Sequence, residues 1–507
     1  MIYIDPPYNT GNDFVYEDDF AENTEEFLQR SNQKDEQGNR LISNSDANGR
    51  FHSDWLSMML PRLKLARNLL RDDGVIFISI DDNEQASLKK LCDEVFGENN
   101  FISNLVWQKK FSRSNDATYF SSMHDHILCY CKNNVMTDQS GWRIGLLPRG
   151  ADIPNGYSNP DNDPRGHWTS VALQAKSGSE KSRYEITTPS GRVCLPPNGR
   201  FWSVSYETYL RLLSENRVWF GVGGEGTPRQ KTFLSEVQAG LRPNTLFLHT
   251  EVGHNQEGKQ ETKALFDGVG VFDGPKPIRL LRHLSIIANT DSSDVIMDFF
   301  AGSATTAHAI MQLNSEDGGN RKFIMVQLPE QVDEKHEAYK VGYKTIAEIS
   351  KERIRRAGAQ ILKGECHADW NKDIGFRVLK VDTSNMQGVY YQPQQLSQDD
   401  LFASVDNIKP DRTSEDLLFQ VLLDWGVDLT LPIRRESIQS KEVFIVDDNA
   451  LVACFEQGIS EALIHELAAL NPLRAVFRDN GFASDAVKVN VTQIFKQRSP
   501  ITEVKAL

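Results

Sequence analysis

The sequence predicts an α/β protein with a Rossmann-like, doubly wound sheet, a β-rich insertion and a small C-terminal α+β domain. Amphipathic helices alternate with short apolar strands on both sides of the insertion, which is the pattern of strand–helix–strand units on a parallel sheet. Between these two parts, apolar runs are short and Gly, Pro, Asn and Trp are frequent, which indicates a separate, irregular domain. The length of 507 residues fits about three domains.

The first α/β part is assigned to residues 1–135. Apolar residues recur at helical spacing over 55–70, an Asp-Gly turn follows at 73–74, and the run VIFISI over 75–80 is typical of a buried strand. This order is a helix–turn–strand unit of a doubly wound sheet. We expect the part to be completed by a helix over 84–96 and strands over 101–108 and 126–130.

The insertion is assigned to residues 136–272, and the α/β pattern resumes over 273–365. In this second part we expect helices over 278–288, 307–313 and 343–362 and strands over 294–300 and 322–327. Residues 373–507 are assigned to the α+β domain. Its expected strands cover 376–380, 443–446, 451–455 and 475–477, and its expected helices cover 414–425 and 460–470.

The composition is that of an ordinary globular protein, with 39% hydrophobic and 25% charged residues. This excludes a wholly disordered or fibrous chain. No apolar run approaches the roughly 18 residues of a membrane helix, and the N-terminus lacks the pattern of a signal peptide. The six cysteines include no Cys-x-x-Cys pair. We therefore expect reduced cysteines, no metal site, no membrane contact and a cytoplasmic protein.

The charge is unevenly distributed along the chain. The net charge of −14 argues against a general nucleic-acid binder. Residues 101–250, however, hold 17 Lys/Arg and 12 Asp/Glu, a balance of +5, so the remainder has a balance of −19. A mildly basic segment suits a localised contact with a polyanion, although an ordinary solvated surface has the same composition.

The first chemical motif is Asp5-Pro6-Pro7-Tyr8, which directly follows an apolar run over 2–4. Consecutive prolines remove two N–H donors and fix two φ angles, so their carbonyls can face a pocket without a local partner. Together with the Asp5 carboxylate and the flat Tyr8 ring, they suit the exocyclic amine of a nucleobase. The alternative is a proline turn with a packed tyrosine, but the position after a strand favours the functional interpretation.

The second motif joins Asp298, Phe299 and Phe300 to a small-residue turn around Gly302. A strand, a tight turn and a helix N-terminus form a site for a nucleotide cofactor. The turn lacks the Lys of a phosphate-binding loop and a Gly-x-Gly-x-x-Gly pattern, which disfavours ATP and dinucleotides. Glu330, near the end of the next expected strand, is placed to accept ribose hydroxyls. A helix packed closely on a strand is the alternative.

With both motifs in this order, the sequence resembles the beta class of amino-methyltransferases that use S-adenosylmethionine. It resembles more specifically the modification (Mod) subunits of type III restriction–modification systems. The matching segments cover most of the chain and lie at 72–84, 276–277, 342–347, 352–354, 376–385, 476–482 and 488–490.

The resemblance implies a methyltransferase sheet and transfer of a methyl group to adenine N6 in DNA. Asp5 and the Pro6 carbonyl would hold the amino group, Tyr8 would stack on the base, and Pro7 completes the catalytic motif. By the same resemblance, S-adenosylmethionine would be held by Lys276, Pro277, Asp298, Phe299, Phe300, Gly302, Ser303 and Glu330.

The resemblance also implies the partners. The target adenine would be flipped out of double-stranded DNA, and residues 136–272 would form the target-recognition domain. Arg and aromatic residues of that domain would either read bases or pack. A second copy of the chain and a restriction (helicase–endonuclease) subunit are the expected protein partners.

Two departures from the family pattern support alternatives. Ala304 stands where the family turn usually has Gly, and its methyl group would fit if its φ angle is negative. Only Met1 to Ile4 precede Asp5, where family members carry a long segment that includes part of the cofactor pocket. The first alternative is therefore a truncated, inactive remnant that binds DNA or the restriction subunit. The second is transfer to another acceptor, either cytosine N4 or a glutamine amide.

Overall fold

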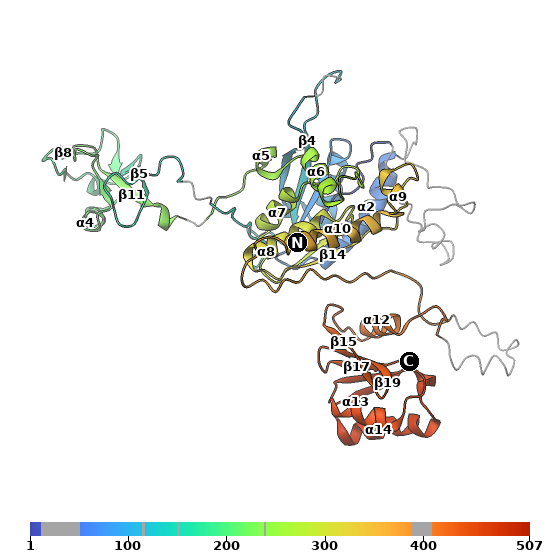
Figure 1. The fold of residues 1–507 in the computed structure, drawn as a ribbon. Coiled ribbons are helices and arrows are strands. Elements are labelled where there is room, and N and C mark those ends of the chain that lie inside the picture. Colours follow the sequence, from blue (N-terminus) through green and yellow to red (C-terminus); the bar gives the residue numbers. More distant parts are fainter. Residues whose placement is uncertain (12–50, 114–116, 150–152, 238–239, 388–407) are drawn as a thin grey trace. The chain divides into compact units, whose positions relative to one another are not determined.

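The computed structural model describes residues 1–11, 51–113, 117–149, 153–237, 240–387 and 408–507 (Figure 1). These residues form two compact units, Met1–Gly375 and Phe376–Leu507. Among the described helices, none combines the length and the apolar character needed to cross a lipid bilayer.

A seven-stranded mixed sheet forms the centre of the first unit. The order of its strands is β12-β3-β4-β2-β1-β13-β14. The middle of the sheet is parallel, because β1 pairs in parallel with β2 and β13, and β13 with β14, whereas β4 runs antiparallel to β2 and β3. The strands are β1 (Ile2–Ile4), β2 (Val75–Ile80), β3 (Phe101–Gln108), β4 (His124–Cys131), β12 (Leu246–Phe247), β13 (Val295–Asp298) and β14 (Lys322–Met325).

The chain changes direction across the sheet between β1 and β13. From β1 it leads to β2 on one side, through helix α2 (Phe51–Leu69). From β13 it leads to β14 on the other side, through α8 (Thr305–Asp317). The carboxyl ends of β1 and β13 are thus neighbours at a topological switch point, where open α/β sheets bind their ligands. This confirms the doubly wound α/β prediction.

Each face of the sheet is covered by helices. On one face, Ile2, Ile4 and the even-numbered residues of β2 pack against α2 and α3 (Gln85–Phe96). On the other face, Tyr3 and Phe77 pack with α7 (Ile278–Ile287) and with one residue of α8. All six residues of β2 are buried, as its continuous apolar run predicts. Helix α10 (Ile346–Ile361) packs on α8.

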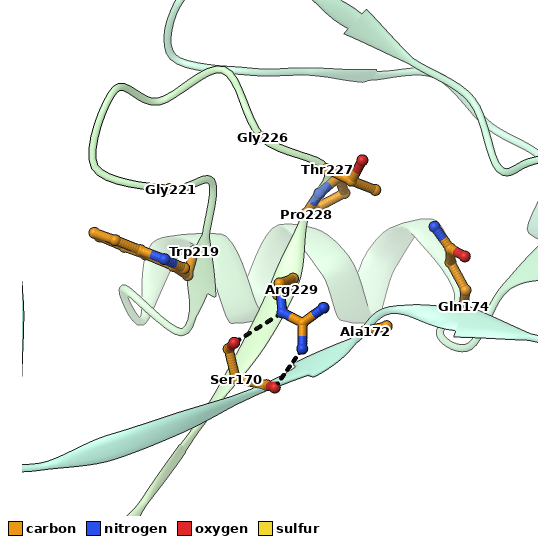
Figure 2. A pocket seen from close by; sticks show the side chains of 9 residues that line it. All are labelled: Ser170, Ala172, Gln174, Trp219, Gly221, Gly226, Thr227, Pro228 and Arg229. Atoms are coloured by element: carbon orange, nitrogen blue, oxygen red, sulfur yellow. Dashed lines mark hydrogen bonds between the residues drawn. The ribbon is translucent and has the colours of Figure 1, made fainter. Parts of the chain in front are cut away.

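Residues 153–237 form a small region with sheets of its own. Strands β10 (Val218–Trp219), β11 (Arg229–Phe233) and β5 (Trp168–Ala172) form a three-stranded antiparallel sheet, and one end of it borders a cavity of about 400 Å³ (Figure 2). Its other elements are β6 (Gln174–Ala175), β7 (Ile186–Thr187), β8 (Val193–Cys194), β9 (Phe201–Trp202) and α4 (Tyr206–Ser214).

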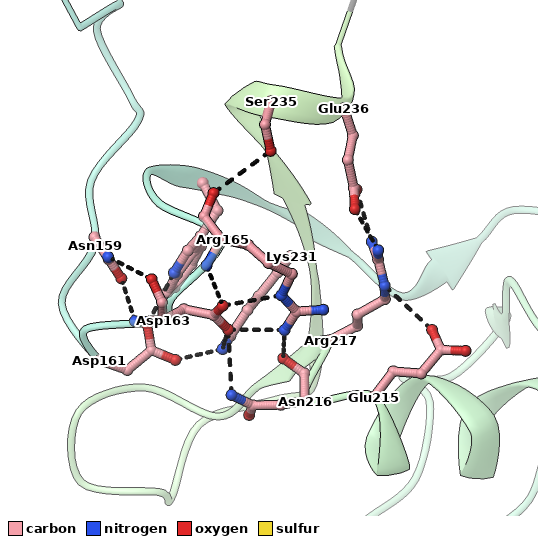
Figure 3. A network of polar contacts seen from close by, with 11 residues as sticks. Asn159, Asp161, Asp163, Arg165, Glu215, Asn216, Arg217, Lys231, Ser235 and Glu236 are labelled. Atoms are coloured by element: carbon pink, nitrogen blue, oxygen red, sulfur yellow. Dashed lines mark hydrogen bonds and ion pairs between the residues drawn. The ribbon is translucent and has the colours of Figure 1, made fainter.

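A polar network stabilises this small region (Figure 3). The Lys231 side chain is fully buried and pairs with the carboxylates of Asp161 and Asp163. Arg165 also donates to Asp163 and lies 4.1 Å from the ring centroid of Phe233. The hydrogen bonds from Arg165 lower the pKa of the Asp163 carboxyl, which stays ionised. Buried charges of this kind are tolerated only when paired.

The range predicted for the insertion, 136–272, is not wholly separate from the central sheet. Strand β12 lies inside that range and pairs with β3, and helices α5 (His249–Val252) and α6 (Asn255–Leu265) follow it. Two residues of a strand carry too little periodicity to be assigned to a sheet from sequence. The domain boundaries themselves stay a prediction.

The second unit has a five-stranded sheet with helices on both faces. Its order is β15-β16-β17-β18-β19, and separate apolar clusters cover the two faces. The elements are α12 (Ser414–Asp424), β15 (Ile433–Ile438), β16 (Lys441–Val446), β17 (Leu451–Cys454), α13 (Glu461–Ala469), β18 (Arg474–Phe477), α14 (Asp485–Arg498) and β19 (Glu503–Ala506).

The strand predicted over 376–380 is wrong. These residues form no strand, and Val378 and Leu379 are 49% and 54% exposed. The Arg377 guanidinium instead donates to the main-chain carbonyls of Leu429 and Leu431. The alternating pattern was present, but no neighbouring strand supplies hydrogen bonds, and a strand needs a partner as well as a pattern.

Candidate active site at two neighbouring strand ends

The Asp5 carboxylate lies at the carboxyl end of β1 between a hydroxyl and an ammonium group. Tyr8 donates its hydroxyl hydrogen to Asp5 Oδ1 over 2.9 Å, and the Lys276 ammonium pairs with Oδ2. The Lys276 nitrogen lies 5.4 Å from the ring centroid of Tyr8 and 5.8 Å from that of Trp107. Asp5 remains 26% exposed, so a ligand can still reach its carboxylate.

Only one of the two proline carbonyls lacks a hydrogen-bond partner among the residues that the structure describes. Trp55 donates its indole N–H to the Pro7 carbonyl over 2.8 Å, so the Pro7 carbonyl has no local partner, as expected, but a distant residue satisfies it. No hydrogen bond to the Pro6 carbonyl occurs among the residues that the structure describes. The motif therefore presents one carboxylate and one main-chain carbonyl as acceptors.

Asn9 extends this motif and was missed by sequence reasoning. Its φ angle is +60°, and its side-chain amide donates to Glu84 Oε1 over 2.7 Å and to the Phe51 carbonyl over 3.2 Å. Asn tolerates this left-handed conformation better than most residues. Asn9 and the buried Glu84 thus fix the direction in which the chain leaves Tyr8. The signal in the sequence was a turn-forming Asn directly after the motif.

Burial keeps the Tyr8 hydroxyl protonated. Removal from water and the nearby Asp5 charge both raise the pKa of Tyr8 well above its ordinary value. The phenol therefore acts as a hydrogen-bond donor to Asp5 and leaves the carboxylate as the negative group.

Asp298, at the carboxyl end of β13, is 2% exposed. Its carboxylate accepts hydrogen bonds from the Thr306 hydroxyl over 2.6 Å and from the Phe300 N–H over 3.1 Å. The pKa of Asp298 is nevertheless raised to about 7: burial is the largest cause and the charge of Asp5 adds to it, whereas the two hydrogen bonds and Lys276 oppose the shift. The two strand ends therefore interact electrostatically.

Two residues of the turn after β13, on either side of Ser303, have a left-handed backbone. Gly302 has φ +51°, its N–H donates to Gln327 Oε1 over 2.7 Å, and an added Cβ would lie 3.1 Å from the Phe272 ring. Ala304 has φ +60°. The condition that would let the Ala304 methyl group fit without strain, a negative φ angle, is not met, and such a conformation costs an L-residue about 1–2 kcal/mol.

Arg353 supports this turn from α10 and was not predicted. It is fully buried, and its Nη1 donates to the hydroxyls of Ser303 and Thr305, both over 2.7 Å. Its Nε and Nη2 have no hydrogen-bond partner among the described residues. Burial lowers the pKa of Arg353 to about 10, and the nearby Glu261 opposes this shift. The buried Arg353 guanidinium therefore orients the Ser303 and Thr305 hydroxyls of the turn from inside the protein.

The remaining predicted cofactor residues lie before α7, directly after β13 and beyond β14. Lys276 and Pro277 directly precede α7. The residue before them, Pro275, packs closely on Gly258, because a Cβ added at Gly258 would lie 2.2 Å from the Pro275 carbonyl oxygen. Phe299 and Phe300 pack beside the α2 face of the core. Glu330 lies five residues beyond β14, and its main-chain carbonyl accepts from the Ile346 N–H over 2.9 Å.

The fold defines a doubly wound α/β protein, and its acceptor pair and glycine turn follow neighbouring strands at the switch point, where such sheets bind ligands. A protein-family model described as DNA methylase matches residues 1–355. The chain therefore belongs to the DNA methylase family.

Three relatives are similar over much of the chain. The Mod subunit of the type III restriction–modification enzyme StyLTI of Salmonella typhimurium is 41% identical over 76% of this chain and 57% of its own length. The Mod subunit of EcoP15I of Escherichia coli is 32% identical over 75% of this chain and 61% of its own. The type II methyltransferase M.KpnI of Klebsiella pneumoniae is 31% identical over 69% of this chain and 80% of its own length. The chain thus spans about three-fifths of the length of the two Mod subunits.

Proposed function

We propose that this chain transfers a methyl group from S-adenosylmethionine to the N6 amino group of an adenine in double-stranded DNA, as the modification subunit of a type III restriction–modification system. The observation that carries the proposal is the pair of acceptors at the end of β1, Asp5 and the Pro6 carbonyl, beside the Tyr8 ring. The identity to the Mod subunits of StyLTI and EcoP15I supports the assignment to a type III system.

The residues of the turn fit the cofactor by their chemistry. Gly302 and Ser303 bring main-chain and hydroxyl groups to the switch point, and Asp298 and Arg353 place one acid and one partly unpaired cation around them. S-adenosylmethionine has an amino group, a carboxylate and ribose hydroxyls, which need such partners. When bound, it supplies an electrophilic methyl group. Lys276, Pro277, Phe299, Phe300 and Glu330 complete the proposed cofactor site.

Asp5 and Pro6 orient the amino group of the base. One N–H of adenine N6 would donate to the Asp5 carboxylate and the other to the Pro6 carbonyl, which directs the nitrogen lone pair away from the ring. Each carboxylate oxygen has two lone pairs, so Asp5 can accept the amine while it retains Tyr8 and Lys276. As the N–C bond forms and the bond between the methyl group and the cofactor sulfur breaks, positive charge would pass from sulfur to N6, where the Asp5 carboxylate would stabilise it. The amino group then loses one proton to Asp5 or to water.

Tyr8 and the insertion are the parts of the chain that would hold the flipped base and recognise the target. N6 of a paired adenine is held inside the duplex, so the base must be flipped out. The Tyr8 ring, fixed through its hydroxyl by Asp5, is a stacking surface for the flipped base. Residues 136–272 would recognise the target, and a second copy of the chain and the restriction subunit are the proposed protein partners.

The test is methyl transfer from labelled S-adenosylmethionine to duplexes that carry adenine or cytosine as the sole possible acceptor. The wild-type chain should label adenine, whereas Asp5→Asn should not. Asp424→Asn, a change of an exposed carboxylate in the second unit, is the matched control and should behave like wild type. Label on cytosine would overturn the choice of acceptor. A folded chain that does not bind S-adenosylmethionine by calorimetry would identify an inactive remnant.

A further inference from the structure

The cavity of about 400 Å³ in the small region is lined by polar, aromatic and glycine residues (Figure 2). It lies where β11 begins and β5 ends. The strand register places Trp219, Arg229 and Ala172 level with one another, so they share one face of the sheet. Gln174 and Thr227 border the same cavity. The cavity therefore combines a flat ring with several hydrogen-bonding groups at the end of an antiparallel strand pair.

Arg229 is held in a defined orientation. Its Nε donates to the Ser170 hydroxyl over 2.8 Å and its Nη2 to the Ser170 carbonyl over 2.7 Å. A guanidinium has five N–H donors in a planar fork, so one edge of the fork is fixed on Ser170. The second hydrogen of Nη2 and both hydrogens of Nη1 remain. Two of these are parallel donors on the edge that faces away from Ser170, and Figure 2 shows Nη1 directed away from that residue.

Arg229 also differs from the cations of the polar network. Arg217 pairs with the carboxylates of Glu215 and Glu236, and Arg165 pairs with Asp163. The buried Lys231 is neutralised in the same way. Within the described residues, Arg229 makes no ion pair with a carboxylate. Its charge is therefore available to a ligand, whereas those of the network stabilise the fold.

Trp219 forms a rigid wall beside this cation. Its ring packs edge-on against the buried Trp168, with the ring centroids 5.1 Å apart. Gly221 has φ +82° and opens the loop that returns to β11, where Gly226 also borders the cavity without a side chain. On its loop side, the cavity is therefore bordered by two residues that have no side chain.

We propose that Arg229 reads a guanine of the target DNA through O6 and N7 in the major groove, with Trp219 and Gln174 beside it. The major groove accepts a two-stranded antiparallel ribbon, and Arg across guanine O6 and N7 is the commonest specific contact there. A pre-oriented, unpaired guanidinium edge at the end of β5 and β11 matches this contact. The inference rests on the proposed function only in taking DNA as the ligand.

The test is selection of bound duplexes from a random-sequence pool by the full chain, which needs no methyl transfer. The wild-type chain should enrich a motif that contains guanine. Arg229→Met keeps a long side chain but removes the donors. It should lower the preference for guanine at one position of the motif by about 5- to 150-fold and leave the other positions unchanged. Ser170→Ala should weaken the same position by a smaller factor, because it removes the hydroxyl that accepts from Nε while the main-chain carbonyl still accepts from Nη2. Arg211→Met, at an exposed arginine of α4, is the matched control and should select the wild-type motif.

Three results would overturn the inference. They are an unchanged motif for Arg229→Met, no motif for the wild-type chain, and uniform weakening over all sequences with a reduced salt slope, which marks a phosphate contact. Thermal unfolding of each variant shows that the fold is retained. A wild-type chain that selects a guanine motif but transfers no methyl group would refute the proposed function and leave the role of Arg229 standing.

Discussion

The buried carboxyl of Asp298 should make the stability of the first unit depend on pH. Its side chain is 2% exposed, and burial raises its pKa from 3.8 to about 7. The folded chain thus binds this proton more tightly than the unfolded chain does. The stabilising contribution is fully present below about pH 4 and is lost as the pH rises through about 7.

The size of the effect follows from the shift. About three pKa units at about 1.36 kcal/mol each correspond to about 4 kcal/mol in the free energy of unfolding. Between about pH 5 and pH 8 the expected loss is roughly 2–3 kcal/mol. Asp298→Asn cannot ionise and keeps the shape of the side chain, so its profile should lack this loss. In the variant, the Thr306 hydroxyl bonds to an amide instead of a carboxylate, which should lower the free energy of unfolding by about 1 kcal/mol at all pH values.

Urea unfolding followed by tryptophan fluorescence is the assay. Seven of the eight tryptophans lie in the first unit, since only Trp425 lies beyond residue 375, so the signal reports mainly on that unit. The result that supports the reasoning is a steeper decline for wild type than for Asp298→Asn between pH 5 and pH 8. Parallel profiles for the two proteins would refute it. Asp424→Asn should follow the wild-type profile.

Three further predictions concern the two strand ends. Asp5→Asn should reduce methyl transfer by about 10²–10³-fold with little change in S-adenosylmethionine binding, measured by labelled transfer and calorimetry; equal losses in both would contradict a role confined to the amino group. Ala304→Gly should stabilise the first unit by up to about 1 kcal/mol, because relief of the left-handed strain exceeds the added chain entropy; a lower urea midpoint would contradict this. Trp55→Phe removes the donor to the Pro7 carbonyl and should destabilise the unit by about 1–3 kcal/mol, whereas an unchanged midpoint would show that water replaces the indole.

Local residue patterns predicted most of the long helices and buried strands of the first unit and the chemical groups that follow two of the strands. The apolar run of β2 predicted a buried strand, and the helical spacing over 55–70 predicted α2, because both depend on local periodicity. The acceptors of the proline motif and the small-residue turn were likewise visible as residue types that follow strands. Family resemblance added the expected reaction and partners, but no contact.

Tertiary structure decided which of these groups meet. Lys276 reaches Asp5 across 271 residues of sequence, and Trp55 satisfies Pro7 across 48. Arg353 supports the turn at Ser303 from α10, a helix that the sequence predicted without any role in the site. None of these pairs has a fixed spacing, because they depend on the parallel alignment of β1 with β13 and on the packing of α10 on α8.

The same reason explains the errors. The pattern over 376–380 resembled a strand but has no partner, whereas the two residues of β12 formed a strand because β3 offered them hydrogen bonds. Of the arginines in the small region, the sequence could not separate Arg229 from Arg165 or Arg217. The difference lies in whether a carboxylate has folded against the guanidinium. Local patterns depend on neighbours along the chain, whereas hydrogen-bond and charge partners depend on neighbours in space, which only the packed structure supplies.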